Sequence, residues 1–232
     1  MNNDLERISA QSQKFKQKKA GWKYLLLALG AFAGLGIEAL YAFVLEPLIY
    51  GRQLQDFTIM QNISHWILTC ITWGLIAFLL IYLAKKKTNF DVFTKTEKLK
   101  VWQWIAVAVL VICAFILSCV NWNGCKVIKE FQFNGLLKFI FQYIYYMFET
   151  LLFTLIIVFG QKAFEQWTEK KNIPYGGIFC AMTWGLVHVL TKSSLSTGLY
   201  SALIGFLFGV VYLLTNRDIK KTYIISYIMF VL

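Results

Sequence analysis

The sequence predicts an all-α, polytopic membrane protein built as one transmembrane helical bundle. Three observations predict this fold class. Of the 232 residues, 58% are hydrophobic and only 15% are charged, whereas soluble domains carry about 25% charged residues. Apolar runs close to 20 residues long recur along the chain, which is the length that an α-helix needs to cross a bilayer. The basic residues cluster between these runs.

The apolar runs predict six full spans and a short C-terminal half-helix. A basic leader, residues 1–21, precedes the first span, and residues 22–232 form a single transmembrane domain. The last run, Thr222–Leu232, would make a helix of only about 16 Å, roughly half of the hydrocarbon core. We therefore expect it to pack against the bundle without crossing. The six spans are predicted at Trp22–Leu45, Ile63–Ala84, Trp102–Val120, Phe139–Gln161, Pro174–Thr191 and Gly198–Thr215.

The distribution of basic residues predicts the orientation. Of the 23 lysines and arginines, 18 lie in the leader and in three alternate loops, and only 5 lie in the opposite loops. Basic loops stay on the cytoplasmic side, so the N-terminus should be cytoplasmic in a multi-pass protein of the cell membrane. We expect the longest polar stretch, Lys85–Lys100, to be a solvated loop. The 18 residues lie in Arg7–Lys23, Lys85–Lys100, Lys162–Lys171 and Arg217–Lys221.

The same clustering explains the net charge of +11. No nucleic-acid-binding motif accompanies that charge. The expected partners are therefore the lipid bilayer and a membrane protein or peptide, not nucleic acid.

Small residues and cysteines add two expectations about the spans. Small residues spaced four apart let helix backbones touch. Cys119 and Cys125 flank a predicted outer helix end, and whether they pair is left open. The small residues are Ser201, Gly205 and Gly209 in one span, and Gly30 and Gly34 in another.

Glu149 and His188 are the candidate site residues, because each lies inside an apolar run of membrane length. Burying such groups in hydrocarbon costs about 3 kcal/mol or more, so they usually face a bundle interior and mark a functional site. They lie about 18 and 21 Å from the cytoplasmic ends of two consecutive spans. We expect them to approach within hydrogen-bond or one-water distance. A buried pair that only specifies helix packing is the alternative.

Three other ionisable residues lie towards the outer ends of the first two spans. Glu38 is the deepest and could be a further polar partner. Glu46 directly precedes Pro47 at a helix exit, so we expect an interfacial side chain. His65 is likewise expected at the membrane interface.

The stretch Glu149–Thr154 reads Glu-Thr-Leu-Leu-Phe-Thr, and Trp184 is followed four positions later by His188. These segments resemble two motifs of the CPBP family of intramembrane proteins, the CAAX-protease and bacteriocin-processing group also called Abi. The family's first motif is Glu-Glu-x-x-x-Arg, and its second is an aromatic residue followed four positions later by His. The resemblance covers residues 139–232, the family-like core.

In active members, the resemblance implies intramembrane peptide hydrolysis, with Glu149 as the general base and His188 orienting water or polarising the scissile carbonyl. The chain departs from the pattern at Thr150 and Thr154, and at Ser226–Phe230, where a third motif would supply a histidine. A catalytic zinc normally has three protein ligands. We therefore expect no metal and no other cofactor, with zinc disfavoured.

Three functions stay open. One is a non-catalytic or weakly active member that acts in envelope protein processing, in immunity or in regulating a membrane partner. Another is an active CAAX-type intramembrane endopeptidase that uses Glu149 and His188. The third is a small membrane transport subunit, for which polar residues should converge from several spans.

Overall fold

The computed structural model describes residues 2–232, with side chains from residue 17 onward. The described residues form helices and contain no β-strand, which confirms the all-α fold class. The long helices are α1 (Asn2–Leu40), α3 (Ile59–Thr88), α4 (Val101–Asn121), α5 (Lys126–Thr168), α8 (Leu195–Leu214) and α9 (Ile219–Val231). The short ones are η1 (Tyr41–Leu45), α2 (Glu46–Tyr50), η2 (Leu54–Asp56), α6 (Tyr175–Cys180), η3 (Ala181–Gly185) and α7 (Leu186–Thr191).

Within the described part of the chain, five helices are long and apolar enough to cross a membrane. The predicted span at Pro174–Thr191 is instead a shorter apolar helix, built from α6, the π-helical turn η3 and α7. A sixth crossing therefore stays a prediction. The leader was predicted as a separate segment, but from Asn2 onward its backbone forms the first part of α1. Met1 lies outside the described residues. The five candidate spans are Gln17–Tyr50, Ile59–Thr88, Val101–Asn121, Lys126–Thr168 and Leu195–Leu214.

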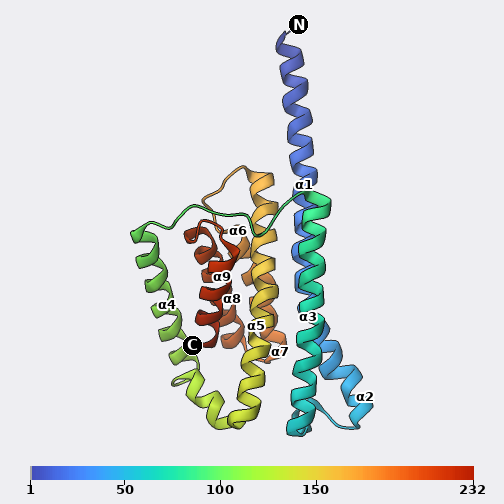
Figure 1. Ribbon diagram of the computed structural model, residues 1–232, viewed down its shortest axis with the longest axis vertical. Coiled ribbons are helices and arrows are strands. Elements are labelled where there is room, and N and C mark those ends of the chain that lie inside the picture. The colour runs from blue at the N-terminus through green and yellow to red at the C-terminus, as the bar shows by residue number, and fades with distance from the viewer. Residues whose placement is uncertain (1) are drawn as a thin grey trace.

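Helix α5 runs through the middle of the bundle, with α1 and α3 on one side and α4, α8 and α9 on the other (Figure 1). Every residue from Leu152 to Phe159 is at most 1% exposed. A helix that is apolar on all sides must be covered on all sides, and the neighbours of α5 supply that cover. The candidate residue Glu149 precedes this fully buried stretch by less than one turn.

The loops rich in lysine lie at one end of the bundle. The start of α1, the α3–α4 connection and the α5–α6 connection share this end (Figure 1). The alternation that the basic clusters predicted is therefore present in the fold.

Most residues of Lys85–Lys100 are exposed, as expected of a solvated loop, but two apolar side chains of this segment pack against the bundle. Phe90 lies edge-on to Tyr24 and Phe159, with ring centroids 5.6 and 6.5 Å away. Val92 is only 6% exposed. These two apolar side chains lie inside a lysine-rich segment and pack near the end of α5. The loop therefore makes hydrophobic contacts that its charged composition did not predict.

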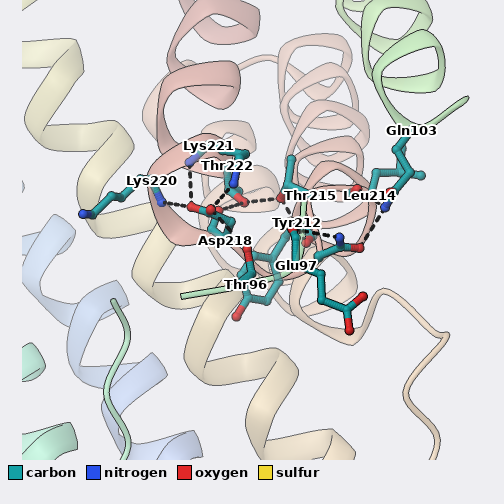
Figure 2. A network of polar contacts seen from close by, with 11 residues as sticks. Thr96, Glu97, Gln103, Tyr212, Leu214, Thr215, Asp218, Lys220, Lys221 and Thr222 are labelled. Carbon is teal, nitrogen blue, oxygen red and sulfur yellow. Dashed lines mark hydrogen bonds and ion pairs between the residues drawn. The ribbon is translucent and has the colours of Figure 1, made fainter. Parts of the chain in front are cut away.

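Polar contacts fasten the same loop to the α8–α9 turn (Figure 2). The Thr96 hydroxyl donates to Asp218 over 3.2 Å, and Asp218 also accepts an ion pair from Lys221. The Gln103 amide nitrogen donates to the Leu214 carbonyl over 2.7 Å. Asp218 caps the first turn of α9 by accepting from two backbone N–H groups of that turn, which fixes where α9 begins.

The predicted close approach of small residues occurs between α6 and α8. A Cβ added at Gly209 would collide with the backbone of Gly177, and one added at Gly205 would lie 3.3 Å from the backbone nitrogen of Ala181. The two backbones therefore touch at this crossing. The contact holds the segment that carries His188 against the bundle.

Candidate functional site

The candidate site lies where α5 meets the segment η3–α7. The Trp184 indole Nε1 donates a hydrogen bond to Glu149 Oε1 over 2.9 Å, and both side chains are buried. His188 Nδ1 lies 2.8 Å from the Trp184 carbonyl oxygen one turn earlier. A carbonyl only accepts, so Nδ1 carries a proton, and in the neutral imidazole Nε2 then presents a lone pair. The site therefore holds a carboxylate and an imidazole base.

Trp184 links the two predicted site residues. The rings of Trp184 and His188 lie 4.9 Å apart at 70°, edge to face. Among the hydrogen bonds of the described residues, none joins Glu149 to His188 directly. Trp184 thus connects the two residues through a chain of hydrogen bonds, and their approach to within one water molecule stays a prediction.

An aromatic cluster fixes the Trp184 indole. Phe153 from α5 and Phe208 from α8 stack in parallel with centroids 4.6 Å apart, and Phe153 lies 5.0 Å from Trp184. Phe230 from α9 lies 5.6 Å from the same indole. Rings at these separations stabilise one another beyond the area that they bury, so the orientation of the donor towards Glu149 is set by four helical segments.

The short helix α9 covers this site, as predicted from its length. Its 13 residues make about 20 Å of helix, too short for a hydrocarbon core of about 30 Å. The Tyr227 hydroxyl donates to the Tyr143 carbonyl of α5 over 3.1 Å, and Tyr223 donates similarly to Met147. These contacts hold α9 along the part of α5 that leads to Glu149.

Hydroxyl side chains occupy the three positions where the CPBP motifs would place a second glutamate, an arginine and a histidine. Thr150, Thr154 and Ser226 are fully buried. Their hydroxyl oxygens have no hydrogen-bond partner within the described part of the chain. None of these groups can act as a carboxylate base or as an imidazole ligand.

A second polar group, which was not predicted from the sequence, lies at the N-terminal end of α5. Gly135 has a positive φ of 68°, which breaks α5 and folds Lys126–Asn134 back along the rest of the helix. The Lys126 ammonium donates to the Phe230 carbonyl over 2.6 Å, and the Tyr146 hydroxyl donates to Glu130 over 2.6 Å. The signal in the sequence was Gly135, a residue that tolerates a positive φ, directly after a segment that carries the charged residues Lys126 and Glu130.

Glu46 and His65 are buried, which corrects the expectation that both are interfacial. Glu46 is 4% exposed and His65 is 2% exposed. His65 Nδ1 lies 2.7 Å from Glu46 Oε2, and His65 Nε2 lies 3.6 Å from Glu38 Oε1. Glu46 and His65 supply each other's hydrogen-bond partner inside the bundle, so neither side chain depends on water at the membrane interface. Glu38 is a polar partner, as expected, but of His65.

A cavity of about 120 Å³ lies away from the Glu149–Trp184 contact, beneath the α3–α4 loop. Its α5 residues begin at Val158 and include Gln161, which is about 18 Å along the helix from Glu149. The Arg217–Glu165 ion pair, with an N–O distance of 2.7 Å, forms part of its wall. The cavity therefore belongs to the lysine-rich end of the bundle.

No family model matches the chain, and neither a curated protein nor a solved structure matches it. Within the described residues, no three His, Cys, Asp or Glu side chains are grouped to hold a metal ion. The expectation about zinc stays a prediction. Cys119 and Cys125 are both free thiols.

Proposed function

We propose that the protein is a multi-pass membrane protein that binds a membrane-embedded peptide or protein partner at the Glu149–Trp184–His188 centre without hydrolysing it. The resemblance of Glu149–Thr154 and of Trp184 with His188 to the CPBP motifs supports this proposal. In this proposal the protein acts as a non-catalytic member would, in envelope protein processing, in immunity or in regulating a membrane partner.

One observation carries the proposal. Glu149 Oε1 is engaged by the Trp184 indole, while the neighbouring motif positions offer only the buried hydroxyls of Thr150, Thr154 and Ser226. Peptide hydrolysis needs a base that takes a proton from water and donors that stabilise the oxyanion. The retained carboxylate and imidazole can instead accept hydrogen bonds from a partner helix, which is favourable in hydrocarbon.

Complementation of a deletion strain of the source organism separates binding from hydrolysis. Glu149→Gln keeps an oxygen that accepts from Trp184 but cannot act as a base, whereas Glu149→Leu keeps neither property. We expect Glu149→Gln to restore the phenotype and Glu149→Leu to fail, at equal levels in the membrane. Glu169→Gln, a change at an exposed site, is the control. If Glu149→Gln fails as completely as Glu149→Leu, the active endopeptidase becomes the better reading.

We further propose that the lysine-rich end of the bundle faces the cytoplasm and that the membrane is the cell membrane. The 18 to 5 division of basic residues supports this orientation. In a variant with all five cysteines replaced, an impermeant maleimide should label Gln53→Cys in intact cells and Thr94→Cys only after lysis. The reverse pattern would overturn the orientation.

A further inference from the structure

A buried histidine lies between two carboxylates on the α1–α3 side of the bundle. His65 Nδ1 is hydrogen-bonded to Glu46 Oε2 at 2.7 Å, and Nε2 faces Glu38 Oε1 at 3.6 Å. The side chains of His65 and Glu46 are 3% and 5% exposed, while that of Glu38 is 34% exposed. The pair is therefore enclosed, and Glu38 forms its more open side.

The π-helical turn η1 explains how α1 and α2 present both carboxylates to one imidazole. Glu38 and Glu46 are eight residues apart, which in a regular α-helix would leave them about 80° apart around the axis. A π-helical turn accommodates one extra residue and commonly marks a functional site. Inserted between the two glutamates, it brings them to within about 20° of the same face.

The geometry favours a doubly protonated imidazole in this cluster. A neutral imidazole has one N–H and one lone pair. If Nδ1–H donates to Glu46, a neutral His65 would direct its Nε2 lone pair at the Glu38 carboxylate. A neutral imidazole would also leave the buried Glu46 carboxylate, and the partly exposed Glu38 carboxylate beside it, without a neighbouring positive charge. An imidazolium directs one N–H group at each carboxylate and lowers the net negative charge of the cluster from two to one.

The groups around the cluster supply no other positive charge. Among the residues with described side chains, no lysine or arginine lies within ion-pair distance of Glu38 or Glu46. The carboxylate of Glu149 and the phenol of Tyr145, both from α5, and the imidazole of His188 from α7 lie within electrostatic reach of Glu38. The Tyr41 hydroxyl of η1 is hydrogen-bonded to Thr72 of α3 at 2.9 Å. The proton is therefore the cation that compensates these acidic groups.

We propose that Glu38, His65 and Glu46 form a proton-binding site, in which His65 is held as an imidazolium that fastens the η1–α2 segment to α3. The site uses other residues than the Glu149–Trp184–His188 centre, although Glu149 and His188 lie within electrostatic reach of Glu38, and it does not depend on the function proposed for that centre. Its ligand is a proton, and losing that proton weakens the attachment of α2.

The chain offers a direct test, because His65 and His188 are its only histidines. Nitrogen-15 labelling of histidine gives ring signals from two residues, and His188→Gln identifies those of His65. In lipid nanodiscs at about pH 8, where free histidine is neutral, we expect both ring nitrogens of His65 to be protonated. A neutral His65 ring at that pH, with one bare nitrogen, would overturn the proposal.

Thermal unfolding provides the second measurement. The folded protein would hold a proton that an exposed histidine has released above about pH 6.5, so stability should fall as the pH rises. We expect the Tm to drop by about 5 °C between about pH 6 and about pH 9, in the wild type and in His188→Gln. His65→Gln should lose this drop. An equal drop in His65→Gln would contradict the proposal, and Glu38→Gln, at the more exposed carboxylate, gives the same test should His65→Gln not fold.

Discussion

The two histidines of this bundle are satisfied by different chemistry. His188 donates from Nδ1 to a main-chain carbonyl at 2.8 Å, while His65 faces two carboxylates at 2.7 and 3.6 Å. The carboxylates differ in the same way. Glu149 accepts from the neutral indole of Trp184, whereas Glu46 accepts from the imidazole of His65.

This difference separates a hydrogen-bonded centre from an ion-paired one. Exchanging a neutral hydrogen bond for water changes stability by only about 0.5–1.5 kcal/mol. Removing one partner of a buried ion pair leaves the other charge uncompensated, which costs about 3–5 kcal/mol. The two centres should therefore respond to the same substitution by different amounts.

The largest expected effect is that of His65→Leu. It leaves Glu46 and Glu38 without their imidazole, so unfolding in mixed micelles should show a loss of about 3–5 kcal/mol. His188→Leu removes a hydrogen bond to a main-chain carbonyl and should cost about 0.5–1.5 kcal/mol.

The double variant Glu46→Leu with His65→Leu is the control for this comparison. Replacing both members of a buried ion pair with apolar side chains is often close to neutral, so most of the lost stability should return. Equal losses in His65→Leu and His188→Leu would show that the two imidazoles do not differ in charge.

Trp184→Phe is expected to have an intermediate effect. It preserves an aromatic ring but removes the donor to Glu149 Oε1, which leaves a buried carboxylate oxygen unpaired and should cost about 1–3 kcal/mol. Trp73→Phe is the matched control, because the Trp73 indole is also buried and donates over 2.9 Å, but to the neutral carbonyl of Gly34. Thermal unfolding should rank Trp184→Phe as the more destabilising change. The opposite order would mean that Glu149 does not depend on the indole.

The sequence located the hydrogen-bonded centre better than the ion-paired one. Glu149 and His188 stand out because charged or titratable groups are rare in apolar runs, and the depth of each follows from helix rise alone. Their connection through Trp184 depends on how the helices are rotated about their axes, which the apolar pattern of a fully buried helix does not record.

The ion-paired centre was mispredicted because a π-helical turn leaves no signature in apolar periodicity. With regular helix geometry, Glu46 falls near an exit and His65 near an interface. The turn η1 rotates Glu46 inward to meet His65. In contrast, the expectation that the C-terminal helix packs against the bundle without crossing followed from its length, which can be read directly from the sequence.

The smallest expected effect lies at the lysine-rich end, where Asp218 provides a reference outside the spans. Asp218→Ala removes the cap of α9 and should cost about 1 kcal/mol, whereas Asp218→Asn keeps a capping side chain and should cost less. Burial alone would raise the pKa of Asp218, but hydrogen bonds from the Lys221 ammonium, from the Lys221 backbone N–H and from Thr96 hold that pKa below its usual value.

A lowered folded-state pKa means that the Asp218 carboxylate stabilises the protein above about pH 4, and that this stabilisation is lost as the pH falls through the folded-state value. Melting curves from about pH 6 to about pH 3 should show a decline that is shallower in Asp218→Asn. Asp91→Asn is the control, because Asp91 is more exposed and its ion pair with Lys85, at 3.3 Å, lies in water. The slope has the opposite sign to that expected of His65, whose cluster is weakened as the pH rises. A wild type that loses stability when the pH is lowered but not when it is raised would support the role of the Asp218 cap. The same result would contradict a protonated His65, and with it the difference in charge between the two histidines.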